Sequence, residues 1–296
     1  MFRKVLLASF TLVFSVSAAV AADTASARAS LSAAEIASKN IEARGGLQAW
    51  RAVQTISWSG KLGAGGNQRS TLPIPVAGKA GGKLAVPPRP AAEVELPFVM
   101  ETQRPRKVRF ELQVKGQTAF QVYDGTNGWK YRPYLNRQDI EPYSEEELKI
   151  ASMEADLDGP LVDFAAKGTR IELAGMEKVE DHDTYKLKLA MKDGRSRYVW
   201  IDAQTFLETK MEGNPRRLDG KEHPVEIYYR DYRSVNGLQI PFVLETKVLP
   251  VATTQLVKEN PIPAEKISIE KVAVNPKLDA SLFTKPQNGS AASLHP

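Results

Sequence analysis

A β-hairpin can be recognised over residues 225–248, and it constrains the fold of this chain more than any other segment. Apolar residues alternate with polar ones on both sides of Asn236-Gly237. This period of two places one set of side chains on one face of a sheet. Asn-Gly is a strong hairpin signal because both residues accept a positive φ. Pro241 lies in the second arm, so we expect an edge strand there, or a proline nitrogen that faces no partner.

The same alternation recurs over residues 94–101, 107–114 and 185–192, with further short strands between them. Such alternation means one buried and one solvated face, which is typical of antiparallel sheets. We expect Phe98, Met100, Phe110 and Phe120 to share one face, opposite Glu101, Lys107, Arg109 and Glu111. Later in the chain, Tyr198 and Trp200 share a face, and Arg195 and Arg197 point to the other.

Two capping boxes mark helices in a chain that otherwise consists of predicted strands. In each box a Ser at the N-cap is followed three residues later by a Glu. The two boxes are Ser32 with Glu35 and Ser144 with Glu147. Gly45-Gly46 ends the first helix. A further short helix is expected over 161–167, because Pro160 suits a first helical position.

The order is therefore helix, strands, a helix pair and strands again, with roughly ten strands and no βαβ rhythm. This predicts an α+β, mainly β protein with one strongly curved antiparallel sheet and its helices on one face. Three short helices are too few to cover ten strands, so we expect an apolar cavity that suits an acyl chain. Ordinary core packing is the alternative for each candidate lining residue. The candidates are Trp58, Phe98, Met100, Phe110, Phe120, Met153, Phe164, Trp200 and Phe242.

The N-terminus predicts export. Arg3 and Lys4 precede a short apolar run that ends in an Ala-x-Ala signal, so residues 1–21 are interpreted as a signal peptide. We expect a soluble periplasmic protein that begins near Ala22. The chain has no cysteine, hence no lipobox and no disulfide. Its formal charge falls from +5 to +3 on cleavage, because 38 basic residues then remain against 35 acidic ones.

Residues 22–285 are predicted to form a single domain. Residues 63–92 are rich in Gly, Pro and Ala and contain four basic residues but no acidic one, so we expect a long loop insertion. A plain flexible loop and a basic loop that contacts lipid or a partner are the two interpretations. Residues 286–296 are expected to form a disordered tail.

Signatures of catalysis are weak in this sequence. It contains no Gly-x-Ser-x-Gly elbow, P-loop or dinucleotide-binding glycine motif. His182 lies between Asp181 and Asp183, where a surface turn is favoured over a metal site because adjacent residues rarely converge on one ion. Around Arg104, Arg106 and Arg109 a solvated strand face is favoured over a lock on a helical lid or a lipid-headgroup contact. We therefore expect no metal, no cofactor and no catalysed reaction.

Three stretches resemble the LolA-like family of periplasmic lipoprotein carrier and sorting proteins. They are Ala43-Arg44-Gly45-Gly46-Leu47, Tyr123-Asp124-Gly125 with Gly128-Trp129, and the hairpin with Asp231-Tyr232-Arg233, Asn236-Gly237-Leu238 and Pro241-Phe242. The resemblance implies an unclosed antiparallel β-barrel whose concave face is covered by helices, with acyl chains held in between. The insertion at 63–92 departs from the compact members of the family.

Together these features predict a monomeric periplasmic carrier that binds a lipid or an acylated lipoprotein, in outer-membrane lipoprotein sorting or lipid transport. Partner proteins at the inner and outer membranes are implied, and nucleic acid is not expected as a partner. An envelope-stress sensor or regulatory protein on the same scaffold is the alternative function. A secreted hydrolase is a third and weaker hypothesis.

Overall fold

The computed structural model describes residues 31–65, 93–218, 220–251 and 264–286. The predicted signal peptide, the insertion beyond residue 65 and the tail beyond residue 286 lie outside these residues. Thirteen strands form one antiparallel sheet. They are β1 (Thr55–Gly65), β2 (Glu93–Gln103), β3 (Lys107–Val114), β4 (Gln117–Tyr123), β5 (Gly128–Arg132), β6 (Arg137–Pro142), β7 (Arg170–Val179), β8 (His182–Ala190), β9 (Ser196–Asp202), β10 (Glu208–Glu212), β13 (Val225–Val235), β14 (Leu238–Val248) and β15 (Glu265–Val274).

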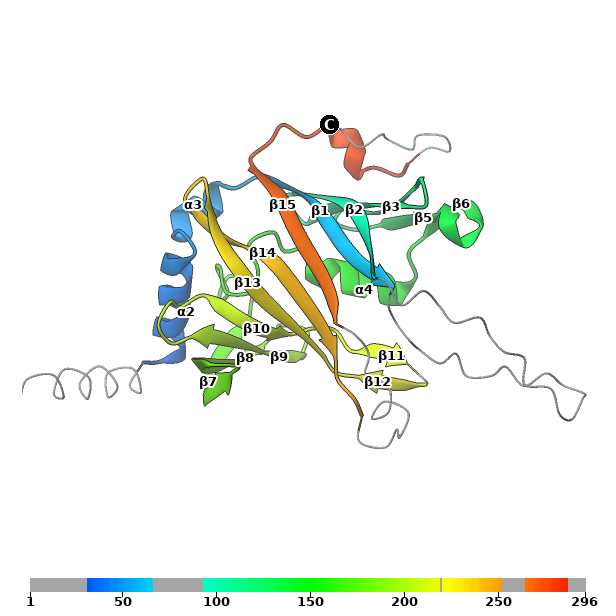
Figure 1. The fold of residues 1–296 in the computed structure, drawn as a ribbon. Coiled ribbons are helices and arrows are strands. Elements are labelled where there is room, and N and C mark those ends of the chain that lie inside the picture. The colour runs from blue at the N-terminus through cyan, green and yellow to red at the C-terminus, as the bar shows by residue number, and fades with distance from the viewer. Residues whose placement is uncertain (1–30, 66–92, 219, 252–263, 287–296) are drawn as a thin grey trace, which may run out of the picture.

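The strand order across this sheet is β6-β5-β4-β3-β2-β1-β15-β14-β13-β10-β9-β8-β7. The sheet is not closed, because β6 and β7 remain as its two edges. The β1–β6 arm and the β7–β10 arm lie on either side of the long β13–β15 strands (Figure 1). Beside the sheet, β11 (Arg216–Leu218) and β12 (Lys221–His223) form a small separate hairpin. The prediction of one open, curved antiparallel sheet is confirmed, with more strands than the ten expected.

The hairpin of β13 and β14 forms as predicted. Asn236 and Gly237 have φ values of 50° and 82°, which is the pattern of a two-residue type I′ turn. Strand β14 is not an edge strand, because β15 pairs with it over 243–246. Pro241 lies outside that paired stretch and opposite Tyr232 of β13. The proline is thus placed where the missing N–H leaves the β14–β15 pairing intact.

Both predicted capping boxes are present. Ser32 and Glu35 exchange hydrogen bonds at the start of α2 (Ala33–Ala43), and Ser144 and Glu147 do so at α4 (Glu145–Glu154). A short α3 (Leu47–Ala52) follows α2. The prediction of a helix over 161–167 is wrong. That segment forms turns, because Asp163 adopts a left-handed φ of 52° that an α-helix cannot contain. Two single-turn 3₁₀ helices, η1 (Pro133–Leu135) and η2 (Ala280–Phe283), complete the structure.

Two apolar clusters define the inner face of the sheet, the face on which α2, α3 and the turns at 155–168 pack. In one cluster Ile36 of α2 and Leu161 of the turns meet β8 and β9. In the other, Trp50 of α3 and Val162 meet β1 and β14. The buried strand residues are Tyr185, Leu187, Leu189, Val199 and Ile201 in the first cluster, and Ile56, Leu238, Ile240 and Phe242 in the second.

The outer face is covered at β3 and β4 by the C-terminal segment. Phe283 of η2 is 1% exposed, and the Leu282 carbonyl accepts a hydrogen bond from Arg109 of β3. Arg109 and Glu111 form a buried ion pair there, and the Arg109 guanidinium lies 5.0 Å from the ring centre of Phe120. Arg109 was expected on a solvated strand face. That expectation is wrong because η2 covers this part of the sheet.

A Schellman motif ends α2 and docks it on the tip of the β13–β14 hairpin. The Gly46 amide donates to Ile41 O and the Gly45 amide to Glu42 O. Gly45 has a φ of 114°, and a Cβ added to it would lie 2.5 Å from the Gly237 carbonyl oxygen. The Gln239 amide donates to the Arg44 carbonyl beside it. Two of the segments that carry the family resemblance therefore contact each other in the fold.

The adjacent glycines allow a matched test of this contact. Gly46 also has a positive φ, of 95°, but a Cβ added there meets nothing within 4 Å. Gly46→Ala should therefore cost only the strain of this extended positive-φ conformation (ψ 153°), about 1–3 kcal/mol. Gly45→Ala adds a clash with backbone and should cost about 3 kcal/mol or more in total. Urea unfolding followed by circular dichroism measures both, and equal costs would show that the hairpin tip yields to the added methyl group.

Candidate functional site

The inner face is incompletely covered where the strands are central to the sheet. On β1 the indole of Trp58 is only half-buried, and Met100 of β2 lies directly opposite it. Phe110 of β3 is opposite Met100 and is half-buried as well. Central strands of an α+β sheet normally bury such side chains, so this surface leaves apolar area in contact with water. The half-buried strip comprises Trp58, Leu62, Leu96, Met100, Phe110, Leu112, Leu244, Ile267 and Ile269.

Helix α4 crosses between the two arms of the sheet without sealing this strip. At its first turn, Lys130 of β5 donates hydrogen bonds of 2.5 and 2.6 Å to the Glu147 carboxylate. At its last residue, Glu154 accepts a 2.6 Å hydrogen bond from Asn214, which follows β10. None of the α4 residues is fully buried. Its apolar side chains, including Met153, are therefore partly exposed, and polar contacts at the two ends hold the helix in place.

The first of these contacts is electrostatic. Burial opposes ionisation of Glu147, but the ammonium of Lys130 and the Ser144 backbone outweigh it and hold the pKa of Glu147 below its usual range. The Glu147 side chain is still 37% exposed, so the ion pair contributes less than about 1 kcal/mol. Tyr143 precedes the helix, and burial raises the pKa of its phenol. This end of α4 is thus positioned by a weak contact at physiological pH.

The segment after α4 is held much more firmly. Asp158 is buried and accepts hydrogen bonds of 2.6 Å from both Arg104 and Lys167. Arg104 also donates to the carbonyls of Trp50 and Val53, which joins this segment to α3. Burial raises and the two cations lower the pKa of Asp158, and the net shift is downward. Of the three arginines considered as a lock on a helical lid, Arg104 therefore holds the segment that follows α4. Arg106 is exposed, and Arg109 is buried on the other face.

Asp158 and Asp163 allow a matched test of this lock. Asp163 pairs at the surface with Arg51, and the Arg51 side chain is 50% exposed. Asp158→Asn leaves Arg104 beside a neutral amide, while Lys167 keeps its 2.7 Å contact with Asp156, and should cost about 3 kcal/mol. Asp163→Asn should cost less than about 1 kcal/mol. Thermal and urea unfolding measure both, and equal losses would remove the distinction between the buried and the surface pair.

The same variant should alter the response to acid. The folded pKa of Asp158 is lowered, so its stabilising effect is complete above the unfolded value of about 3.9. The effect is lost as the pH falls through the folded pKa. Stability of Asp158→Asn should therefore depend less steeply on pH below about 4 than stability of the unmodified protein.

Most of the predicted site residues lie on the inner side. Trp58, Phe98, Met100, Phe110 and Phe242 project from the inner face, and the rings of Phe98 and Phe110 stack with centres 5.8 Å apart. Of these, Phe98 and Phe242 are buried in packing. Met153 lies on α4. Phe164 lies in the turns and packs against the cluster under α2. The structure thus brings Trp58, Met100 and Phe110 together on three adjacent strands.

Phe120 and Trp200 do not belong to this set. Phe120 pairs with Glu111, and its ring contacts that of Tyr131 in a tilted arrangement, which places it on the outer face and not with Phe98, Met100 and Phe110. The two-residue turn at Lys115-Gly116 causes this, since it pairs Val114 with Gln117 and so shifts the alternation by one residue. The expectation for Phe120 is therefore wrong.

Trp200 is also an outer-face residue. It is buried beneath lysine side chains, with Lys210 Nζ 3.9 Å and Lys186 Nζ 5.0 Å from its ring. Its indole N–H donates to Glu177. Its role as a cation–π centre in sheet packing explains its burial without a ligand.

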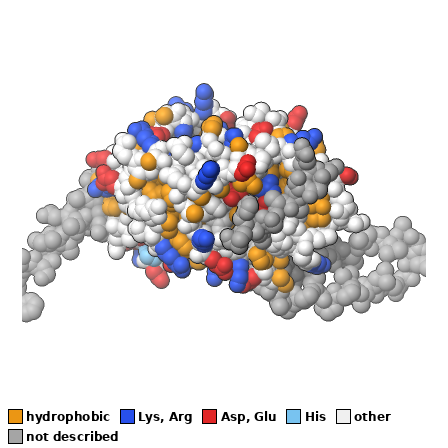
Figure 2. All heavy atoms as spheres, turned by 90° about the horizontal axis from the view of Figure 1, so that it is seen from above, with side chains coloured by type: hydrophobic (Ala, Val, Ile, Leu, Met, Phe, Trp, Pro, Cys, Tyr) orange, Lys and Arg blue, Asp and Glu red, His pale blue; other side chains and the backbone are white. Residues whose placement is uncertain are grey.

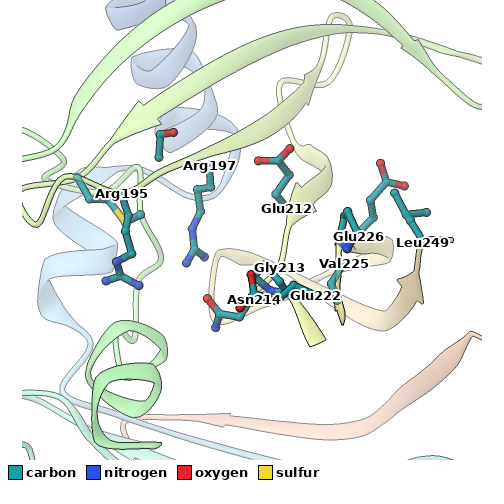
Figure 3. A pocket seen from close by; sticks show the side chains of 13 residues that line it. Arg195, Arg197, Glu212, Gly213, Asn214, Glu222, Val225, Glu226 and Leu249 are labelled. Atoms are coloured by element: carbon teal, nitrogen blue, oxygen red, sulfur yellow. The ribbon is translucent and has the colours of Figure 1, made fainter. Parts of the chain in front are cut away.

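A pocket of about 460 Å³, lined by both charged and apolar residues, lies where β9 begins and β10 ends, beside the β11–β12 hairpin. Figure 3 shows Arg195 and Arg197 extending toward one side, whereas Glu212 and Glu226 extend toward the other. The opposed orientations follow from the strand register, because Arg197 pairs with the inward Leu189 and Glu212 pairs with Glu226. The sequence had placed the two arginines opposite Trp200, but nothing in it indicated a pocket.

The Asp181-His182-Asp183 segment forms a surface turn and the start of β8. His182 Nδ1 lies 2.8 Å from Asp202, and the described part of the chain contains no group of three His, Cys, Asp or Glu residues arranged to bind a metal. In the same residues, no helix combines the length and apolar character needed to cross a membrane.

Solved structures with the same fold were found, although no family model and no curated protein matches the sequence. A LolA superfamily protein from Nitrosomonas europaea aligns with a TM-score of 0.50 at 13% identity, over 86% of this chain and 99% of that one. A putative outer membrane lipoprotein-sorting protein domain from Vibrio parahaemolyticus gives 0.51 at 13% identity, over 85% and 95%. A DUF1329 family protein from Desulfovibrio piger gives 0.50 at 12% identity, over 83% and 95%. The chain has the LolA-like fold that the sequence resemblance predicted.

Proposed function

From its LolA-like fold and its partly uncovered inner face, we propose that this chain is a carrier or binding protein for the acyl chains of a lipid or an acylated protein. The observation that carries the proposal is the half-buried strip of Trp58, Met100, Phe110 and their neighbours under a helix with no buried residue. An acyl chain laid between the strip and α4 would remove apolar surface of both from water.

The magnitude of this effect suits a carrier. Each buried methylene contributes roughly 0.8 kcal/mol, so about ten of them supply on the order of 8 kcal/mol before ordering costs. A net binding free energy of about 8 kcal/mol would correspond to a dissociation constant of about 1 μM. The ordering costs weaken binding below that limit, so the ligand can still leave on a useful timescale. The side chains of the strip are mostly Leu, Ile, Met and aromatic residues, which accept flexible chains without specific hydrogen bonds.

The cellular setting is proposed from the same observations. A signal peptide at residues 1–21 would deliver the protein to the periplasm, and one structural relative is described as an outer membrane lipoprotein-sorting domain. Transport between membranes requires donor and acceptor partners. Lys, Arg, Asp and Glu side chains are interspersed over the face viewed in Figure 2, so apolar contacts fit the role of this protein better than attraction by one sign of charge.

Bound lipid tests the proposal directly. Protein purified from the periplasmic fraction without detergent, then extracted with organic solvent, should release an acylated molecule in near-stoichiometric amount by mass spectrometry. The intact mass of the same sample should correspond to a chain beginning near Ala22. Delipidated protein that fails to bind any fluorescent fatty acid would contradict the proposal.

Met100 is the most informative position for mutagenesis. It is half-buried between Trp58 and Phe110, so a lysine there can reach water while placing a charge in the acyl site. Met100→Lys should remain folded and lose binding of the fluorescent fatty acid by at least about tenfold. The control is Leu135→Lys in η1, where the side chain is 50% exposed and away from the strip.

Two results at Met100 would count against the proposal. If Met100→Lys unfolds the protein by several kcal/mol, the strip is closed core at this position. A folded variant with normal binding places the ligand elsewhere. Circular dichroism melting beside the displacement assay separates these results.

Release is proposed to require α4 to move off the strip. Lys130→Met removes the ion pair to Glu147 and should free the first turn of the helix at a cost below about 1 kcal/mol. Ligand dissociation measured by stopped-flow fluorescence should therefore accelerate several-fold while the melting temperature changes little. An unchanged dissociation rate would mean that α4 does not limit release.

A further inference from the structure

We infer that the pocket formed by Arg195 and Arg197 binds the anionic group of an amphiphile, a phosphate of a lipid headgroup, whose acyl chain lies along the inner face. This inference rests on the proposed function and adds a class of ligand to it. The pocket holds about 460 Å³, which is within the usual range for small-molecule sites.

Arg197 is the central observation. Its guanidinium is half-buried, yet it makes no hydrogen bond or ion pair with any residue that the structure describes. Its strand neighbour Arg195 is paired with Asp193, and Arg216 nearby is bound by both oxygens of Glu265. The donors of this half-buried guanidinium face the pocket and remain available to an anionic ligand. Burial accordingly lowers the pKa of Arg197.

Three carboxylates, Glu212, Glu222 and Glu226, also line the pocket, and none of them forms an ion pair with Arg197. Glu212 and Glu226 line the same pocket but point to the outer side (Figure 3), where the first accepts from the Tyr198 amide and the second from Lys210. Glu154 at the end of α4 is the acidic group on the inner side that acts on Arg197 at a distance, and it is bound to Asn214.

The pocket also borders apolar residues of the inner face. Val225 and Met191 form part of its wall, and Ile227, two residues along β13 from Val225, faces inward beside Met211 of β10. A guanidinium at the end of an apolar surface matches an amphiphile, in which an anionic group is joined to a hydrocarbon chain. Guanidinium groups bind phosphate oxygens in a bidentate, charge-assisted manner, which lysines do not reproduce.

The test compares two ligands that differ only in the phosphate, monomyristoylglycerol and monomyristoylglycerol phosphate. Displacement of a fluorescent fatty acid from delipidated protein gives both dissociation constants. The phosphate-bearing ligand should bind at least about tenfold more tightly, and this preference should shrink as salt is raised. Arg197→Gln should abolish the preference while leaving affinity for the neutral ligand within about twofold.

The matched control is Arg217→Gln. Arg217 is an exposed residue of β11 on the neighbouring hairpin, so this change removes the same charge outside the pocket and should leave the preference intact. Arg197→Lys keeps a cation but not the planar fork, and should retain part of the preference. If circular dichroism shows that Arg197→Gln is unfolded, Arg197→Lys replaces it in the test. Full affinity of the lysine variant for the phosphate-bearing ligand, with no effect of salt on that affinity, would overturn the inference.

The remaining outcomes are distinct. Equal affinity of the unmodified protein for both ligands overturns the headgroup inference and leaves the acyl carrier proposal standing. Failure to bind either ligand overturns both. Inorganic phosphate alone that binds as tightly as the lipid phosphate would identify a free-phosphate site and overturn the lipid source.

Discussion

The inner face of a thirteen-stranded open sheet must be buried against something, and the rest of this structure depends on that requirement. Three helices and a set of turns supply the cover. Two of the helices and the turns at 155–168 form tight clusters with β8, β9, β1 and β14. They leave a strip on the central strands under α4, where aromatic and aliphatic side chains remain half-exposed. The proposed acyl site is the part of the inner face that the protein does not cover with its own atoms.

Polar contacts position the cover where apolar packing is thin. The segment after α4 is locked by the buried carboxylate of Asp158 between Arg104 and Lys167. Among the described residues, the polar contacts that join helix α4 to the sheet are the Lys130–Glu147 pair at one end and Glu154 with Asn214 at the other. Elements with few buried apolar contacts open at low free-energy cost. A firm lock beside a weakly held helix allows that helix to move while the flanking cores stay intact.

Local signals in the sequence predicted much of this arrangement. Asn236-Gly237 predicted the hairpin, and the Ser–Glu pairs at 32–35 and 144–147 predicted the starts of α2 and α4, because each signal acts within a few residues. Phe120 was misplaced although its turn was also local. The pair Lys115-Gly116 makes a two-residue connection, and counting across it would have put Phe120 with Glu111.

Sequence alone thus determined the strands, their alternation, the helix caps and the charge of each side chain, since these depend on single residues or on residues close together in the chain. Only the tertiary structure decided which faces are covered. Arg109 is buried because η2, about 170 residues later, packs over it. Asp163 lies inside the predicted helix, but it adopts a left-handed φ of 52° at a position where it accepts hydrogen bonds from Arg51. Arg197 is left without a partner because neighbouring strands send their carboxylates to the opposite face. Such long-range choices depend on how the sheet curves and pairs, which no short stretch of sequence specifies.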